Sequence, residues 1–271
     1  LFLSKNSVCL FFNATLVNQY ILFGSYGGYS ATNPPREVYF SQDNGETWDL
    51  VYEKNISDMN DAGNFHIHDV AFDPYSNAII VSEGDNVNRQ ISYSYDFGET
   101  WETFFDTDVY GIGNPALNHP TSILCFPEGI AFGSDELPEG ISWWERPIGV
   151  TNPPMGLENL SYKITFNEEF DNIIGTYATK GDTLQTSTGF YGIMPFKNHE
   201  TTTEGYTRLY ATGDGGRTWH EIFREDEWSS DYKGFFNAFL REETDGIYIY
   251  GTYSKLGRVQ VWKAKMLNFY I

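Results

Sequence analysis

An eight-residue pattern that occurs three times constrains the fold of this chain more than any other feature. It reads SQDNGETW at 41–48, SYDFGETW at 94–101 and TGDGGRTW at 212–219. In each copy the aspartate can accept hydrogen bonds from backbone amides two or three residues on, and the glycine permits the positive φ of a tight turn. Aromatic and β-branched residues on both sides predict a β-hairpin, whose tryptophan opens the second strand as an anchor. The turn positions are Asp43, Gly45, Trp48, Asp96, Gly98, Trp101, Asp214, Gly216 and Trp219.

The spacing of these turns predicts a repeated unit. Asp43 and Asp96 lie 53 residues apart, and Asp214 follows Asp96 after 118 residues, about twice that interval. Periods of this size are typical of solenoids and propellers, so one unit has lost its turn signature. An apolar run that ends in a small residue also recurs, which brings the number of units to five. These runs are ILFGSY at 21–26, IIVSEG at 79–84, IAFGSD at 130–135, IIGTYA at 173–178 and IYGTYS at 249–254.

We therefore predict an all-β fold, a five-bladed β-propeller with four antiparallel strands in each blade. The expected blades of this single domain cover approximately 1–53, 64–105, 119–150, 160–224 and 235–271. The third hairpin, GISWWERPIGV, lacks the aspartate and glycine of the turn, so we expect an irregular or three-stranded third blade. Because the sequence opens at Leu1 without an initiator methionine, we expect the domain to belong to a longer chain.

The repeated turn resembles the Asp-box, or BNR, repeat. The arrangement is similar to the β-propellers of sialidases and of related carbohydrate-recognising proteins, including receptor-binding tail proteins of bacteriophages. The resemblance covers nearly the whole chain at the level of blades but only three turns at the level of motifs. Because a fold does not carry a function with it, the resemblance implies carbohydrate recognition only as an expectation.

The catalytic patterns of the resembling enzymes do not transfer to this sequence. A sialidase-like site needs three arginines, a tyrosine nucleophile with a glutamate partner and an acid, and that family carries an R-I-P signature near its start. Here the one Arg-Pro pair is Arg146 and Pro147, in the middle of the chain and without the isoleucine. Five-bladed glycosidases use three carboxylates at successive inner-strand positions, and only Asp69 fits that pattern. We therefore assign no catalytic residue.

The charge of the chain limits its partners. The net charge is −20 at pH 7, and such a surface repels phosphate backbones and anionic lipid. We therefore expect no nucleic-acid partner and no membrane insertion, and no apolar segment approaches the roughly 20 residues that span a bilayer. Neutral sugars remain compatible with this charge.

The expected ligand face is the one opposite the repeated turns. In a propeller whose strands run outward from the channel, the repeated turns lie on one face, and the connections between second and third strands and between blades lie on the other. Those connections are long here, and long loops on a rigid scaffold commonly carry recognition. They include 26–37, 53–68, 83–90, 106–120, 178–205 and 224–234.

The segment NFHIHDV at 64–70 is the strongest local cluster. If the strand has begun there, His66 and His68 project to one side and Asp69 to the other, and His119 could approach from the next blade. Three such histidines could hold a metal ion, but we expect no metal and no cofactor, with the histidines bonded to a ligand or to the channel rim. The expected ligand-binding residues are Tyr26, Tyr29, Arg36, His66, His68, Asp69, Arg89, His119 and Trp228.

Together these features favour binding over catalysis. We expect a carbohydrate-binding propeller module of a phage tail or a secreted adhesion protein, extracellular or on the virion. Its partners would be a glycan or cell-surface polysaccharide and other domains of the same chain. Two alternatives stay open: a glycoside hydrolase that uses Asp69 and a loop acid, and a protein-binding assembly scaffold.

Overall fold

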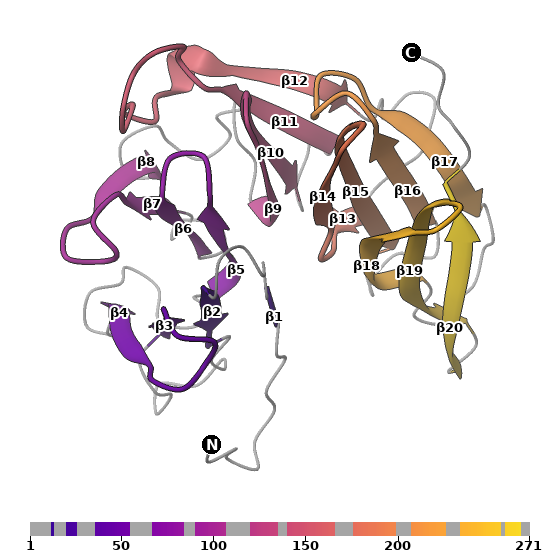
Figure 1. Ribbon diagram of the computed structural model, residues 1–271, viewed down its shortest axis with the longest axis horizontal. Helices are drawn as coiled ribbons and strands as arrows, with labels where there is room; N and C mark the ends of the chain where they lie inside the picture. The colour runs from indigo at the N-terminus through magenta and orange to yellow at the C-terminus, as the bar shows by residue number, and fades with distance from the viewer. Residues whose placement is uncertain are drawn as a thin grey trace. The chain divides into compact units, whose positions relative to one another are not determined.

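Among the residues that it describes, the computed structural model contains β-strands and one short 3-10 helix, Leu157–Asn159, which confirms the all-β prediction (Figure 1). No described helix has the length and apolar character needed to cross a membrane. The structure describes residues 12–13, 20–25, 36–54, 67–83, 90–106, 120–134, 140–165, 176–198, 207–225, 234–255 and 258–266.

The chain divides into two compact units, which we describe separately. The first unit comprises residues 1–114 and 148–158. It contains two four-stranded antiparallel sheets with the strand orders β1-β2-β3-β4 and β5-β6-β7-β8. The strands are β1 Phe12–Asn13, β2 Ile21–Gly24, β3 Arg36–Ser41, β4 Asp49–Lys54, β5 Ile67–Asp73, β6 Ala78–Glu83, β7 Gln90–Ser94 and β8 Glu102–Asp106.

The second unit comprises residues 115–147 and 159–271. A four-stranded sheet is followed by an eight-stranded one, in which β13 and β14 both pair with β15, and β18 joins β15 through the pair Lys197 and Gly234. The strands are β9 Pro120–Phe126, β10 Gly129–Ser134, β11 Gly140–Glu145, β12 Leu160–Thr165, β13 Thr176–Ala178, β14 Asp182–Thr186, β15 Gly189–Asn198, β16 Thr207–Thr212, β17 His220–Glu225, β18 Gly234–Glu243, β19 Gly246–Lys255 and β20 Arg258–Lys265.

These pairings correct part of the expected blade plan. The strand at 160–165, which we expected to open the fourth blade, is β12 and pairs with β11. The third sheet is therefore four-stranded, so the three-stranded alternative is wrong, while the connection from β11 to β12 is irregular in that its residues 148–158 belong to the first unit. The region 178–205, expected to be an insertion, contains all of β14 and β15. Because β13–β17 and β18–β20 form one continuous sheet, the count of five blades stays a prediction.

The three repeated turns share one set of hydrogen bonds. In the second turn Ser94 Oγ accepts from Gly98 N at 2.8 Å, and Asp96 Oδ1 accepts from Thr100 N at 2.8 Å. The aspartate thus binds the amide four residues on, not two or three. The bonds from the Thr100 hydroxyl and amide lower the pKa of Asp96 to about 2. The same contacts occur with Ser41, Asp43 and Thr47, and with Thr212, Asp214 and Thr218.

The turn glycines meet two requirements at once. Gly98 and Gly216 have φ values of +98° and +88°, which favour glycine. A Cβ on Gly98 would lie 2.5 Å from Val51 Cβ in the neighbouring sheet, and one on Gly216 would lie 2.5 Å from the Trp143 ring. The second and third turns are therefore packed against adjacent sheets as well as closed on themselves.

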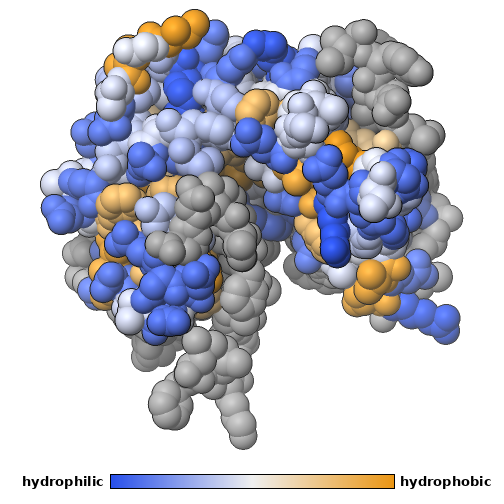
Figure 2. All heavy atoms as spheres, in the orientation of Figure 1, coloured by the Kyte–Doolittle hydropathy of each residue, from blue (hydrophilic) through white to orange (hydrophobic). Residues whose placement is uncertain are grey.

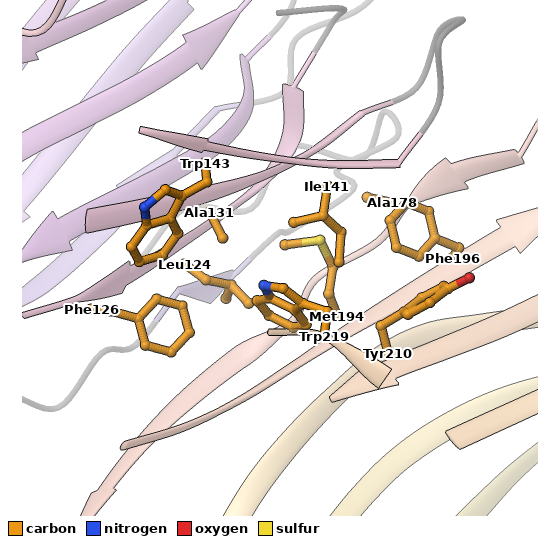
Figure 3. Close-up of a cluster of buried hydrophobic side chains, with 10 residues drawn as sticks. All are labelled: Leu124, Phe126, Ala131, Ile141, Trp143, Ala178, Met194, Phe196, Tyr210 and Trp219. Atoms are coloured by element: carbon orange, nitrogen blue, oxygen red, sulfur yellow. The ribbon is translucent and has the colours of Figure 1, made fainter. Parts of the chain in front are cut away.

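Apolar side chains fill the spaces between neighbouring sheets within each unit. In the second unit Trp143 of the third sheet and Trp219, the residue before β17, lie in one buried cluster (Figure 3), and the Phe126 and Trp219 ring centroids are 6.2 Å apart. Burying a side chain of this size stabilises the fold by about 1.5–3 kcal/mol. A corresponding cluster in the first unit joins its two sheets and contains Leu22, Val38, Phe40, Ile67, Val70, Phe72, Ile79 and Val81.

Candidate functional site

Of the expected ligand face, the structure describes the ends of the strands that border the long connections. The connections at 26–35, 55–66 and 84–89 leave the first two sheets at the end opposite the repeated turns, and they lie outside the described residues. Six expected ligand-binding residues also lie outside the described residues: Tyr26, Tyr29, His66, Arg89, His119 and Trp228. Arg36, His68 and Asp69 are described, and all three lie near this end of the first unit.

A cluster of charged and polar side chains joins the two sheets at this end. The Lys54 ammonium donates to Glu83 Oε1 at 3.1 Å and to Gln90 Oε1 at 2.8 Å. The Tyr52 hydroxyl donates to the same Glu83 oxygen at 2.5 Å. The Glu83 side chain is fully buried, and the Lys54 side chain is 22 % exposed. The cluster is thus a charge pair with neutral hydrogen-bonding partners, placed directly before two connections.

Strand periodicity explains why these charges meet. Ile79, Val81 and Glu83 are every second residue of β6 and therefore share one face, and Ile79 and Val81 belong to the core between the two sheets. By the same alternation Arg36 lies on the face of β3 that carries Val38 and Phe40. Arg36 is completely buried, and the register pairs it with Lys54. Among the described residues, two cations and one carboxylate therefore lie at the end of this inter-sheet core.

The repeat shows that Glu83 is a departure from the pattern. The runs ILFGS, IIVSE and IAFGS place Ser25 and Ser134 where the second sheet has Glu83. Each serine hydroxyl accepts an amide hydrogen from the next strand, from Glu37 N to Ser25 and from Gly140 N to Ser134, both at 2.9 Å. A serine is therefore sufficient to hold these strand ends together.

Burial sets the protonation of the tyrosine in this cluster. Loss of solvation raises the pKa of Tyr52 well above its usual value, and the Glu83 charge and hydrogen bond raise it further. Tyr52 is therefore a neutral donor at any physiological pH. Together with Lys54 it stabilises the buried Glu83 carboxylate, which would otherwise be costly to remove from water.

The structure separates Asp69 from this cluster. A bulge between Ile67 and Asp69 makes His68 an additional residue in β5, and His68 is buried. After the bulge, Asp69 alternates with Val70 and Phe72 of the inter-sheet core, so it lies on the opposite face from Glu83. The Asp69 carboxylate accepts the Val70 amide at 2.9 Å. No metal-binding group occurs among the described residues.

The second unit has polar links at the corresponding strand ends. Glu225 lies six residues after Trp219, as Lys54 lies six residues after Trp48, and Glu225 accepts a hydrogen bond from the hydroxyl of Tyr253 in β19. Arg208 is buried, and its Nη1 atom lies 3.5 Å from Glu221 Oε2. Buried charge next to the long connections is thus a feature of both units.

Asp182 is a buried carboxyl that the sequence did not single out. Its two oxygens accept the Leu240 amide at 2.9 Å and the Thr183 amide at 2.8 Å. Burial raises the pKa of Asp182 to about 6, although these hydrogen bonds and Lys180 act in the opposite direction. Because both oxygens are bonded to backbone amides, Asp182 joins β14 to β18.

Sequence reasoning missed Lys54, Glu83, Tyr52 and Gln90. A signal for Glu83 was available, because it is the one acidic residue at that position of the three aligned runs. Lys54, Tyr52 and Gln90 carry no comparable signal, since each is an ordinary residue at a strand end. Their role follows only from the packing of the first sheet on the second.

Comparison with known proteins supports the fold. No protein-family model matches the sequence, and no curated protein sequence matches it significantly. The GH74 xyloglucanase from Xanthomonas campestris matches 91 % of this chain with a TM-score of 0.57 and 10 % identity, over 35 % of its own length. YCF48 from Cyanidioschyzon merolae matches 93 % of the chain and 68 % of its own, with a TM-score of 0.49 and 14 % identity.

A Trypanosoma rangeli sialidase matches 89 % of this chain and 41 % of its own, with a TM-score of 0.49 and 13 % identity. This chain spans about a third of the length of the xyloglucanase. At 10 % identity the likeness to the xyloglucanase supports a β-propeller fold and carries no activity with it.

Proposed function

We propose that this chain is a carbohydrate-binding propeller module whose ligand contacts the strand ends that carry Arg36, Lys54 and Glu83. The observation that carries the proposal is the pairing of Lys54 with the buried Glu83, at a position where the first and third sheets have serine. The fold likeness to a xyloglucanase adds support.

The chemistry of the cluster suits sugar hydroxyls. A hydroxyl both donates and accepts, so its recognition needs donors and acceptors side by side. The Lys54 ammonium supplies donors, while Glu83 and the Gln90 amide supply acceptors. Hydrogen bonds to charged groups are roughly twice as strong as neutral ones. A neutral glycan also avoids the repulsion that the net charge of −20 imposes on anions.

The remaining parts of the proposal concern context. We assign the repeated turns to the Asp-box type with a structural role, because their aspartates bind the turn's own backbone. The module would act outside the cell or on a virion, as the receptor-binding or adhesion part of a longer protein. Its ligand would be a glycan or cell-surface polysaccharide.

A glycan array followed by calorimetry on the strongest ligand tests the proposal. Glu83→Gln removes the charge and keeps the shape, and we expect binding to weaken about tenfold or more, since 1.4 kcal/mol is a factor of about ten. Glu102→Gln is the matched control, because Glu102 accepts from Tyr93 in the same sheet but at the end of the repeated turn. Equal affinity of a folded Glu83→Gln protein and the wild type would refute the assignment of this site.

A glycoside hydrolase is the second candidate. Asp182 favours it, because a carboxyl whose pKa is raised to about 6 has the protonation that a general acid needs. Its two backbone hydrogen bonds argue for a structural role instead. Reducing-sugar release from the bound glycan distinguishes the two functions: binding without turnover supports the module, and turnover that Asp182→Asn abolishes supports the hydrolase. If the protein neither binds a glycan nor releases reducing sugar, a protein-binding scaffold is favoured.

A further inference from the structure

A cluster in the second unit repeats the positions of the cluster at Lys54. Glu225 lies as far after its turn as Lys54 does, and the run IYGTYS places Tyr253 where the run IIVSEG places Glu83. Each pair is joined by a hydrogen bond, Lys54 to Glu83 in the first unit and Tyr253 to Glu225 in the second. The link between an outer strand and the second strand of the next set is therefore present in both units.

Strand register extends the correspondence to a further position. Glu83 pairs with Gln90, and Tyr253 pairs with Gln260, in each case seven residues on. The strand before each pair also has an irregularity at the same place, next to the residue that pairs with Glu83 or with Tyr253. The two strand ends are thus built in the same way, although three of these four side chains are different in type.

The fourth position of the cluster is aromatic in both units. Tyr52 lies two residues before Lys54, and Phe223 lies two residues before Glu225. The residues of the second unit that correspond to Tyr52, Lys54, Glu83 and Gln90 are Phe223, Glu225, Tyr253 and Gln260, which we call the Glu225 cluster.

The Glu225 cluster contains an aromatic ring that is partly exposed and held in place. Phe223 is 40 % exposed, whereas Tyr253 is 8 % exposed and belongs to the core that β19 shares with β15 and β16. The two ring centroids are 6.4 Å apart, and the ring planes meet at 72°. In Figure 2 the described surface is mainly hydrophilic, with hydrophobic residues in small groups. An exposed phenylalanine ring supported by a buried tyrosine differs from that surface.

Two polar side chains belong to the same part of the structure as this ring. Glu225 and Phe223 are two residues apart in β17, so they share one face of the strand. Gln260 is exposed and shares the face of Tyr253, because residues directly opposite each other in antiparallel strands point to the same side. The carboxylate accepts hydrogen bonds, and the amide both donates and accepts them. The Glu225 cluster therefore combines an apolar ring with both kinds of hydrogen-bonding group.

We propose that the Glu225 cluster is a second sugar-binding site, in which a neutral pyranose lies against the Phe223 ring and its hydroxyls bond to Glu225 and Gln260. The ring offers a large and rigid apolar surface at a low cost in conformational entropy. A hydroxyl that donates to a carboxylate forms a charge-assisted hydrogen bond, which is stronger than a neutral one.

Charge selects the class of sugar. The cluster at Lys54 contains a cation beside its carboxylate, whereas the four residues of the Glu225 cluster contain one carboxylate and no cation. The whole chain has a net charge of −20. A sugar that carries a carboxylate or phosphate would therefore be repelled, and a neutral sugar would not. For the class of ligand this inference rests on the proposed function, but its site lies in the second unit.

Amide NMR spectra of the isotopically labelled protein test the proposal during titration with the methyl pyranosides of glucose, galactose, mannose and fucose. At least one of these sugars should shift the amide signals of β17 and β19 in a saturable way. Glu225→Gln should raise the dissociation constant measured from these signals about tenfold or more. Phe223→Ala should also weaken binding there, because it removes the apolar surface.

Glu221→Gln is the matched control. Glu221 lies in the same strand and also accepts a hydrogen bond from a tyrosine, but that tyrosine is Tyr210, which belongs to the core with the third sheet. The dissociation constant of the Glu221→Gln protein should equal that of the wild type. Equal weakening by Glu221→Gln and Glu225→Gln would overturn the proposal, since both changes would then act through the fold.

The signals that respond separate this inference from the proposed function. Shifts confined to β4 and β6 would overturn the second site and leave the first in place. Shifts confined to β17 and β19 would support the second site and show that the ligand does not contact the cluster at Lys54. If none of the four sugars shifts either set of signals, both proposals are wrong.

Discussion

The sequence predicted which residues form the repeated turns, but not which backbone amides those residues bind. The pattern identified Asp96 and Gly98 as turn residues, yet the aspartate binds the fourth amide on, and the serine at the end of the strand closes the rest of the turn. Glu83 could be recognised only by comparing the runs with one another. Asp182 could not be recognised, since burial and a neighbouring strand determine its environment.

Asp182 should make the stability of the protein depend on pH in an unusual direction. Its pKa rises from 3.8 in the unfolded chain to about 6 in the fold, so between these values the folded protein binds more protons. Stability should therefore fall as the pH rises from about 4 to 6 and stay level above. Two pKa units correspond to about 3 kcal/mol.

Guanidinium titrations of the wild type and Asp182→Asn over this pH range measure the effect. The variant loses a hydrogen-bond acceptor at every pH, so the informative quantity is the difference between the two unfolding free energies and how it changes with pH. That difference should change by about 3 kcal/mol between pH 4 and 7. A difference that is independent of pH would show that Asp182 has an ordinary pKa.

At the scale of elements, strands could be predicted more reliably than their pairing. LSYKIT at 160–165 has the alternation of any half-buried strand, and only the pairing with β11 shows that β12 closes the third sheet. The connection from β11 to β12 lacks the turn signature and is long. Part of it, 148–158, belongs to the first unit, where Tyr95 donates to the Pro153 carbonyl and Tyr93 accepts the Met155 amide. The spacing of motifs in the sequence cannot predict that this connection belongs to the first unit.

The repeated turns should be stabilising elements with no part in ligand binding. Ser94 is buried, and its hydroxyl accepts from Gly98 N and donates to Asp96. Ser94→Ala leaves the Gly98 amide without this acceptor and should cost about 1–3 kcal/mol, measured by chemical denaturation. Glu99→Ala, an exposed change in the same turn, should cost much less. Loss of glycan binding in a Ser94→Ala protein of unchanged stability would place the site at the turns instead.

At the scale of the whole molecule, the two units could not be predicted from the repeat. A turn that repeats at regular spacing predicts that every sheet packs on the next in the same way. The first unit instead has a core of its own around Ile79 and Val81. The second unit has two clusters that run through the third sheet and the eight-stranded sheet. In repeat architectures each unit contacts mainly its neighbours, so stability can be distributed unevenly along the chain.

This division predicts that damage to one core stays in its unit. Ile79→Ala removes buried methyl groups from the core of the first unit and should destabilise it by about 2–5 kcal/mol. Hydrogen exchange should then accelerate in β2, β3, β5 and β6, while the amides of β15 and β16 keep their protection. Ile193→Ala, an equally buried change in the second unit, should give the reverse pattern. If either substitution accelerates exchange equally in both units, the chain unfolds as a single cooperative body, and the boundary between the units has no energetic meaning.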